Sequence, residues 1–221
     1  MNIQNYKIRY TPNFQALHVA DCNQLKLYKI TSNSDLKFLK ALPFNIKMEN
    51  LMPKLSKDEY SRWNEMLEYA VDNAQKSGNT TYIETFKDKI CGIITFTPGN
   101  NTKLDCICTW PIEFGQKVKL AGQTLFYQMF SDFQKLKGKK IKLEAITNGP
   151  YDTISKYEKL GFKATSNVHP TKTEMEITAP KIKDMLKELS NILEYKNSSN
   201  EQIDLFESIN CLLYTSPSPR D

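Results

Sequence analysis

The chain has 221 residues, of which 40% are hydrophobic and 25% charged, and its formal net charge at pH 7 is +5. This balance is typical of a folded domain with a core of ordinary size, and it argues against a disordered chain. No apolar run is long enough for a membrane span, so no membrane partner is expected. The lysines are scattered, which indicates a solvated surface; nucleic acid is therefore not favoured as a partner, although a basic rim would suit an anionic cofactor.

The cysteines indicate free thiols rather than a metal site. Five are present: Cys22, Cys91, Cys106, Cys108 and Cys211. Their spacing fits no zinc site and the two histidines add none, so the expectation is no metal. The first ten residues lack the apolar core of a secretory signal, which predicts a cytoplasmic protein with buried, reduced cysteines.

The first half of the chain predicts a mixed α/β pattern. Ser56 is a candidate N-cap for a long helix, since Glu59 stands three residues later and completes a capping box. A three-stranded meander follows that helix, with turns at Asp88 and at 98–101. The expected elements are a strand over 25–30, helices over 34–42 and 56–76, and strands over 80–86, 90–97 and 104–110.

The second half predicts alternating helices and strands. The expected elements are helices over 122–136 and 151–160, strands over 141–146, 162–164 and 173–177, and an amphipathic helix after Pro180. That last helix could pack on the domain, on a second subunit or on a further C-terminal segment.

The last eleven residues, 211–221, change composition abruptly and interrupt a helical pattern. They resemble the translation of an adapter used in sequencing libraries, and our hypothesis is that this tail is non-native. The expected organisation is an N-terminal extension over 1–24, a main domain over 25–178, a C-terminal helical extension over 179–210, and the tail.

The most informative motif is Tyr157-Glu158-Lys159-Leu160-Gly161-Phe162. Ile154, Tyr157 and Leu160 share one helix face, Gly161 suits a left-handed helix end, and Phe162 suits an apolar residue packed back over that end. With the order of elements over Leu25–Thr178, this string resembles the GNAT superfamily of acyl-CoA-dependent N-acetyltransferases. The resemblance implies an α/β (α+β) fold in which helices flank a mixed, mostly antiparallel central sheet. The amphipathic helix is an addition at its C-terminal end.

The resemblance also implies acetyl-CoA as acyl donor, with its pyrophosphate at the N-terminus of the 122–136 helix. Lys117 stands at the basic first position of the family pattern, Leu120 where a first glycine is usual, and Gly122 at the last position. Main-chain N–H groups at a helix N-terminus bind phosphate oxygens. The implied contacts are Lys117, Val118, Lys119, Leu120, Ala121, Gly122, Gln123 and Thr124. The alternative is an ordinary loop-to-helix junction in which Gly122 permits close packing.

Two further cofactor contacts follow from the resemblance. Ile107, Cys108 and Thr109 would offer main-chain donors to the pantetheine arm where the sheet splays; the alternative is a fully paired core strand. Asn148 would contact CoA after strand 141–146; the alternative is a plain turn residue.

The catalytic residues implied by the resemblance are Tyr157, as general acid for the leaving thiolate, and Asp105, as candidate general base. Strand alternation predicts that Asp105 shares a face with Ile107 and Thr109, opposite Leu104, Cys106, Cys108 and Trp110. Glu84 is a second candidate base, and a water chain is a third alternative. For Tyr157 the alternative is a core tyrosine.

The predicted function is N-acetyl transfer from acetyl-CoA to a primary amine by direct attack in a ternary complex. Alternatives are a longer acyl-CoA donor, and a non-catalytic or other acyl-CoA-binding module with the same fold, including one whose pyrophosphate loop has lost the cofactor. The acceptor amine would bind near 34–76 and 163–173, but its identity stays open, as does a homodimer.

Overall fold

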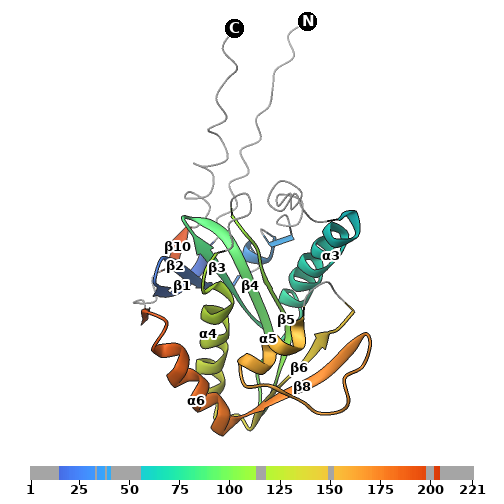
Figure 1. Ribbon diagram of the computed structural model, residues 1–221. Helices are drawn as coiled ribbons and strands as arrows, with labels where there is room; N and C mark the ends of the chain where they lie inside the picture. Colours follow the sequence, from blue (N-terminus) through green and yellow to red (C-terminus); the bar gives the residue numbers. More distant parts are fainter. Residues whose placement is uncertain are drawn as a thin grey trace, which may run out of the picture.

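A computed structural model describes residues 15–32, 34–37, 39–40, 56–112, 118–148, 152–197 and 202–204 (Figure 1). Lys117 and the 211–221 tail lie outside the described residues. The strands are β1 (Gln15–Cys22), β2 (Leu25–Lys29), β3 (Thr80–Phe86), β4 (Lys89–Thr97), β5 (Asn101–Thr109), β6 (Lys140–Ile146), β7 (Lys163–Ala164), β8 (Lys172–Thr178), β9 (Tyr195–Asn197) and β10 (Gln202–Asp204). The helices are α3 (Lys57–Ala74), α4 (Ala121–Lys135), α5 (Thr153–Lys159) and α6 (Ala179–Ser190). Residues 34–37 and 39–40 are also helical.

The strands form one sheet in the order β10-β1-β2-β3-β4-β5-β6-β8-β7, with β9 also paired to β1. The β5–β6 pair is parallel, and the other pairs within the described residues are antiparallel. This arrangement confirms the predicted fold class. It also places β1, from the predicted N-terminal extension, beside β9 and β10 from the C-terminal extension.

The two strongest local signals form as the sequence predicts. Ser56 caps α3: its hydroxyl accepts from the Glu59 N–H at 3.3 Å, and the Ser56 N–H donates to the Glu59 carboxylate at 2.7 Å. Gly161 ends α5 in the left-handed region at φ +85°, and Phe162 packs back over that end at 1% exposure. Both signals are local, so they depend little on the rest of the fold.

The helices cover the sheet unequally (Figure 1). One face carries α4 and α6, which pack together over an aromatic core that includes Phe126, Phe130 and Phe162. The last predicted helix therefore packs on its own domain. The other face carries α3, whose Leu67, Ala70 and Val71 pack toward β3, β4 and β5. No helix in the described residues is both long and apolar enough to cross a membrane.

Candidate functional site

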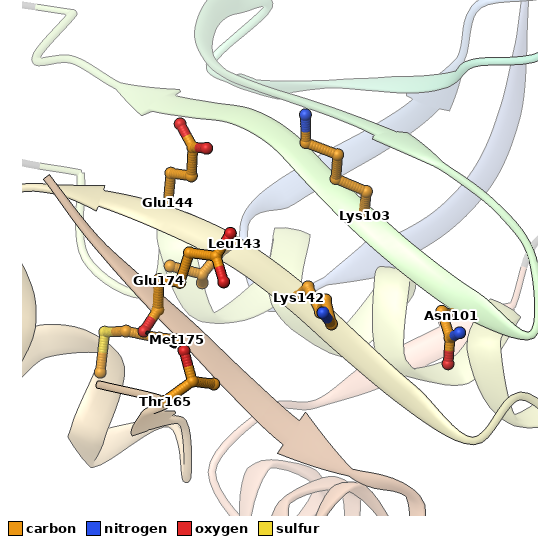
Figure 2. A pocket seen from close by; sticks show the side chains of 8 residues that line it. All are labelled: Asn101, Lys103, Lys142, Leu143, Glu144, Thr165, Glu174 and Met175. Atoms are coloured by element: carbon orange, nitrogen blue, oxygen red, sulfur yellow. Dashed lines mark hydrogen bonds between the residues drawn. The ribbon is translucent and has the colours of Figure 1, made fainter.

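The sheet opens between β5 and β6. Their parallel pairing joins Asn101–Lys103 to Lys140–Lys142 and goes no further. β6 continues to pair with β8 over its whole length on its other side, and β5 continues with β4. Past Lys103 and Lys142, the facing edges of β5 and β6 are therefore not paired with each other, as their divergence in Figure 2 shows. The alternative of a fully paired core strand is wrong.

Main-chain donors of β5 point into this opening. The Trp110 N–H donates to the Cys91 carbonyl of β4 at 2.8 Å. Because successive N–H groups in a strand point to opposite edges, Cys108 directs its N–H toward β4, whereas Ile107 and Thr109 direct theirs toward the opening. Of the three predicted pantetheine donors, the backbone geometry therefore favours Ile107 and Thr109.

A β-bulge at Asp105 changes which side chains share a face. Phe96 pairs with Leu104 and Thr95 pairs with Cys106, so Asp105 is the extra residue on β5. Consequently Leu104 and Ile107 both pack on the α4 side, while Cys106 and Cys108 face α3. The predicted alternation, which grouped Leu104 with Cys106, was wrong because an inserted residue reverses the pattern from that point on.

Asp105 lies just past the end of the β5–β6 pairing. Its side chain is 9% exposed, and its Oδ1 lies 3.8 Å from the Lys103 Nζ. Its Oδ2 accepts a hydrogen bond from the Thr97 hydroxyl at 2.9 Å. By alternation from Ile93, Thr97 belongs to the α3 face. Asp105 is thus a mostly buried carboxyl group on the α3 side of the opening.

The N-terminus of α4 presents main-chain donors for which the described part of the chain supplies no acceptor. Its N-cap, Leu120, makes no side-chain capping bond, and the first intrahelical bond runs from the Thr124 N–H to the Leu120 carbonyl at 2.9 Å. The N–H groups of Ala121, Gly122 and Gln123 precede that bond and have no partner within the helix. Such a set of donors, with the positive end of the helix dipole, binds anions.

Leu120 occupies the position where the family pattern has a glycine, and its backbone is left-handed, at φ +67°. An L-residue in this region costs about 1–2 kcal/mol, a cost that glycine avoids. The backbone at Leu120 is therefore left-handed without the residue that adopts this conformation most easily.

Gly122 is not explained by packing. A Cβ added to it would meet no described heavy atom within 4 Å, and its φ is not positive. The close-packing alternative is therefore not supported. By contrast, the Thr124 side chain is fully buried, with its hydroxyl 3.1 Å from the Leu120 carbonyl and 3.3 Å from the Cys22 Sγ. Val118 is half-buried and Lys119 exposed, just before this turn.

Tyr157, on α5, packs its ring edge-on against Phe126 and Phe162, at centroid distances of 6.1 and 5.9 Å. Burial raises the pKa of Tyr157 above its usual value, and the thiols of Cys106 and Cys108 add to the rise. Those thiols are on β5, and α5 itself contacts β6, so the phenol lies in the aromatic core near the strands that border the opening. Its raised pKa keeps the phenol neutral and able to donate at neutral pH.

Glu84, the second candidate base, is fully buried on β3. Neither of its carboxyl oxygens has a hydrogen-bond partner among the described residues, and burial raises its pKa well above the ordinary value. A Cβ on Gly92 would lie 3.2 Å from its Oε2, which shows how closely the core surrounds it. With no access to solvent, Glu84 is poorly placed to take a proton from a substrate.

The end of β6 connects the two segments expected to bind the acceptor. The Arg62 guanidinium, on α3, donates to the main-chain carbonyl of Asn148 at 2.7 Å. The adjacent Thr147 hydroxyl donates to the His169 carbonyl at 2.6 Å, in the loop between β7 and β8. Asn148 leaves its own side chain exposed at this junction.

A groove of about 300 Å³ lies where β5, β6 and β8 meet (Figure 2). Lys103 from β5 and Glu144 from β6 stand across the opening from each other, with Glu174 of β8 nearby. The complete lining is Asn101, Lys103, Lys142, Leu143, Glu144, Thr165, Glu174 and Met175. Within the described ranges, no three His, Cys, Asp or Glu side chains are grouped to hold a metal ion.

Sequence reasoning missed several of these contacts. The roles of Arg62, Thr97 and the bulge depend on residues brought together by long-range pairing, and no motif marks them.

Four described cysteines, Cys22, Cys91, Cys106 and Cys108, are free thiols.

No family model and no curated protein matches the chain. A solved structure described as a "putative acetyltransferase" is similar to it, with a TM-score of 0.53 and 13% identity over 79% of this chain and 96% of the other. The chain has the GNAT fold. A spermidine N-acetyltransferase from Vibrio cholerae, in complex with CoA and spermine, is 18% identical, with a TM-score of 0.46 over 72% of this chain and 98% of that one. At such identities the likeness extends to the fold alone.

Proposed function

We propose that the protein is an N-acetyltransferase that uses acetyl-CoA and acts on a primary amine. The observation that carries the proposal is the β5–β6 opening, where two sets of main-chain donors without a partner among the described residues occur near a neutral phenol. The first set is Ile107 and Thr109 on β5, and the second is the first turn of α4. The phenol is Tyr157, on α5.

These donors match the parts of an acyl-CoA. An anionic pyrophosphate is stabilised by residues 121–123, because helix N–H groups and the helix dipole favour negative charge there. The amide-rich arm pairs with the free edge of β5 as a further strand would. A main-chain donor beside the thioester oxygen would contribute about 10²–10³ in rate by stabilising the developing oxyanion. Gly122 leaves room for close approach of the pyrophosphate.

The chain's own residues then handle two protons. When bound, acetyl-CoA supplies an activated acyl group, and its thioester C–S bond breaks as the C–N bond to the amine forms. Asp105 accepts the proton that the amine nitrogen loses, and Tyr157 donates its phenolic proton to the departing thiolate, so that CoA leaves as the thiol and both residues then exchange their protons with solvent. The raised pKa of Tyr157 makes complete proton transfer harder, but the same burial also raises the pKa of a thiol beside it.

Thermal stabilisation by acetyl-CoA tests the cofactor half of the proposal, since a ligand that binds the native state must raise the melting temperature. Release of CoA in the presence of a panel of primary amines tests the transfer half. Stabilisation without CoA release for any amine would favour the non-catalytic acyl-CoA-binding module. No stabilisation at millimolar acetyl-CoA would contradict the acetyltransferase proposal and favour a non-catalytic module that has lost the cofactor. A larger shift with longer acyl-CoAs would favour a different donor.

Two further expectations belong to this proposal. The free thiols accord with the predicted cytoplasmic location, and a homodimer remains a prediction that sedimentation velocity would test. We infer that the acceptor amine approaches Asp105 from the α3 side; the groove in Figure 2, which Lys103 lines, and the junction at Asn148 support this direction.

A further inference from the structure

Cys106 and Cys108 bring two thiols into contact on β5. Their Sγ atoms lie 3.9 Å apart, at alternate positions on the face of the strand that α3 covers. The other described cysteines, Cys22 and Cys91, are fully buried in the core of the opposite face. The function proposed above uses the main chain of β5 here, but it gives the paired thiols no role.

The two thiols differ in access and in hydrogen bonding. Cys106 is half-buried, whereas Cys108 is 3% exposed. The Cys106 thiol donates to the main-chain carbonyl of Met66, 3.9 Å away on α3. Because a thiol has one proton, the contact between the two sulfurs is then a donation from Cys108 to Cys106. Cys106 is therefore the thiol that a reagent reaches first, and Cys108 is held against it.

We propose that Cys106 is a thiolation site that Cys108 resolves: a small disulfide thiolates Cys106, and Cys108 then closes a disulfide across Ile107. In the first step the Cys106 thiolate attacks one sulfur of the small disulfide, whose S–S bond breaks to release one small thiol. In the second step the Cys108 sulfur, having lost its proton to solvent, attacks the Cys106 sulfur and expels the second small thiol. The small disulfide gains the two electrons that the cysteines lose.

The hydrogen bond between the thiols favours this order of steps. It is the first cause, ahead of burial, of a Cys108 pKa well above the ordinary value, so Cys108 stays protonated while Cys106 reacts. Thiolation leaves Cys106 without a charge, and its contribution to the raised pKa of Cys108 then disappears. Cys108 therefore loses its proton more easily once there is a mixed disulfide to attack.

The strand can change shape at this pair. Alternate Cα atoms in an extended strand are about 6.4–6.8 Å apart, the upper end of the separations that a disulfide bridges. Closure should therefore shorten β5 and shift Ile107. Only β4 pairs with the strand here, because the β6 pairing ends at Lys103, and the bulge at Asp105 immediately precedes the pair. A strand that is paired on one edge deforms at lower cost than one paired on both.

The shift would reach the proposed cofactor contact. The Ile107 N–H is one of the two β5 donors directed into the opening, so closure should weaken acetyl-CoA binding. This consequence rests on the proposed function, whereas the thiol chemistry does not. Because closure distorts the strand, the disulfide should be easier to reduce than an unstrained one, and a small thiol should restore the open form.

Peptide mass spectrometry of the folded full chain tests the pair. The protein is incubated with glutathione disulfide, free thiols are blocked with N-ethylmaleimide, and trypsin then releases residues 104–117, which hold both thiols and no other cysteine. In wild type we expect this peptide to lose two hydrogen atoms and to carry little mixed disulfide. In Cys108→Ala the mixed disulfide at Cys106 should become the main product, and in Cys106→Ala the peptide should stay unmodified.

The wild-type time course tests the order of steps without any substitution, since a mixed disulfide should precede closure. Cys91→Ala, in the core of the opposite face, is the matched control and should react as wild type does. The proposal is overturned if residues 104–117 stay unmodified at millimolar glutathione disulfide. It is also overturned if the mixed disulfide persists in wild type, or if Cys106 pairs with a cysteine other than Cys108.

Acetyl-CoA stabilisation, measured on the reduced and the closed protein, keeps the two proposals separate. If acetyl-CoA raises the melting temperature of the reduced form, closure should diminish that rise, and addition of dithiothreitol should restore it. An equal rise in both forms would overturn the effect of closure on Ile107. If the disulfide closes as expected but acetyl-CoA stabilises neither form, the acetyltransferase proposal fails and the thiolation site stands.

Discussion

The two faces of the sheet differ in how completely helices cover them. On the α4 face, Leu125, Met129 and Phe130 are fully buried, and even the carboxyl group of Glu84 is enclosed. On the α3 face, α3 packs toward β4 and β5, while Lys142, Glu144 and Glu174 stay exposed on β6 and β8. The α4 face is thus closely packed, and the proposed site lies where β5 and β6 separate, beside the less covered face.

Tyr157 connects the two regions, and its loss should have the largest effect. Tyr157→Phe keeps the ring contacts with Phe126 and Phe162, so folding and acetyl-CoA stabilisation should be unchanged. Removing the hydroxyl should lower kcat about 10²-fold or more, the usual contribution of a positioned acid. Tyr69→Phe, on an exposed α3 tyrosine, is the control. Wild-type turnover in Tyr157→Phe would show that Tyr157 contributes to the core and not to catalysis.

Gly122 tests whether the α4 N-terminus binds the cofactor. A Cβ added at Gly122 meets no described heavy atom within 4 Å, so substitution by valine should change the free energy of unfolding little. Bound acyl-CoA would be obstructed, and the dissociation constant should rise at least about tenfold, or 1.4 kcal/mol. Titration calorimetry measures this, with Gly99→Val as a control at another glycine whose Cβ would meet no described atom. Equal affinity of Gly122→Val and wild type for acetyl-CoA would show that the cofactor does not bind at the N-terminus of α4.

Glu84 tests whether the core on the α4 face excludes water. Its pKa is raised in the folded state, so the folded protein holds a proton that the unfolded chain releases above about pH 4.3. Stability should therefore fall as pH rises from there toward the folded pKa, by up to about 1.4 kcal/mol per pH unit. Urea unfolding of Glu84→Gln and of wild type isolates this contribution. The difference between their free energies of unfolding should grow as pH rises. A difference independent of pH would show that Glu84 is ionised in the fold.

The smallest effect is expected at the far end of α4, where Lys137 is left-handed at φ +54°. Glycine is favoured in that conformation after a helix, so Lys137→Gly should stabilise the protein by about 0.5–1 kcal/mol without changing acetyl-CoA affinity. Lys139→Gly, at a residue without positive φ, should not stabilise. Equal effects of both substitutions in urea unfolding would contradict the backbone explanation.

Local signals carried most of what the sequence could predict. The capping box at Ser56 and the glycine at 161 act within a few residues, so their patterns identify α3 and the end of α5. The bulge at Asp105 adds one residue to a strand and leaves no mark in composition, so the alternation assigned from sequence failed there. At Leu120 the residue type departs from the glycine of the family pattern, yet the backbone is left-handed, a conformation that glycine adopts easily.

Long-range pairing was beyond sequence reasoning. β1 lies in a segment predicted as an extension, yet it pairs with β2, β9 and β10, which come from both ends of the chain. The contacts that join Arg62 to Asn148, and Thr97 to both Asn79 and Asp105, also arise only after the sheet has formed.

Site-resolved amide hydrogen exchange, with and without acetyl-CoA, tests the central claim most directly. If acetyl-CoA binds in the β5–β6 opening, the N–H groups of Ile107 and Thr109 and of residues 121–123 should become protected together. Cys108, whose N–H is directed toward β4, and the C-terminal turn of α4 should change little. Protection elsewhere, such as the groove lined by Thr31, Ser32 and Lys76, or no protection at saturating acetyl-CoA, would contradict the account.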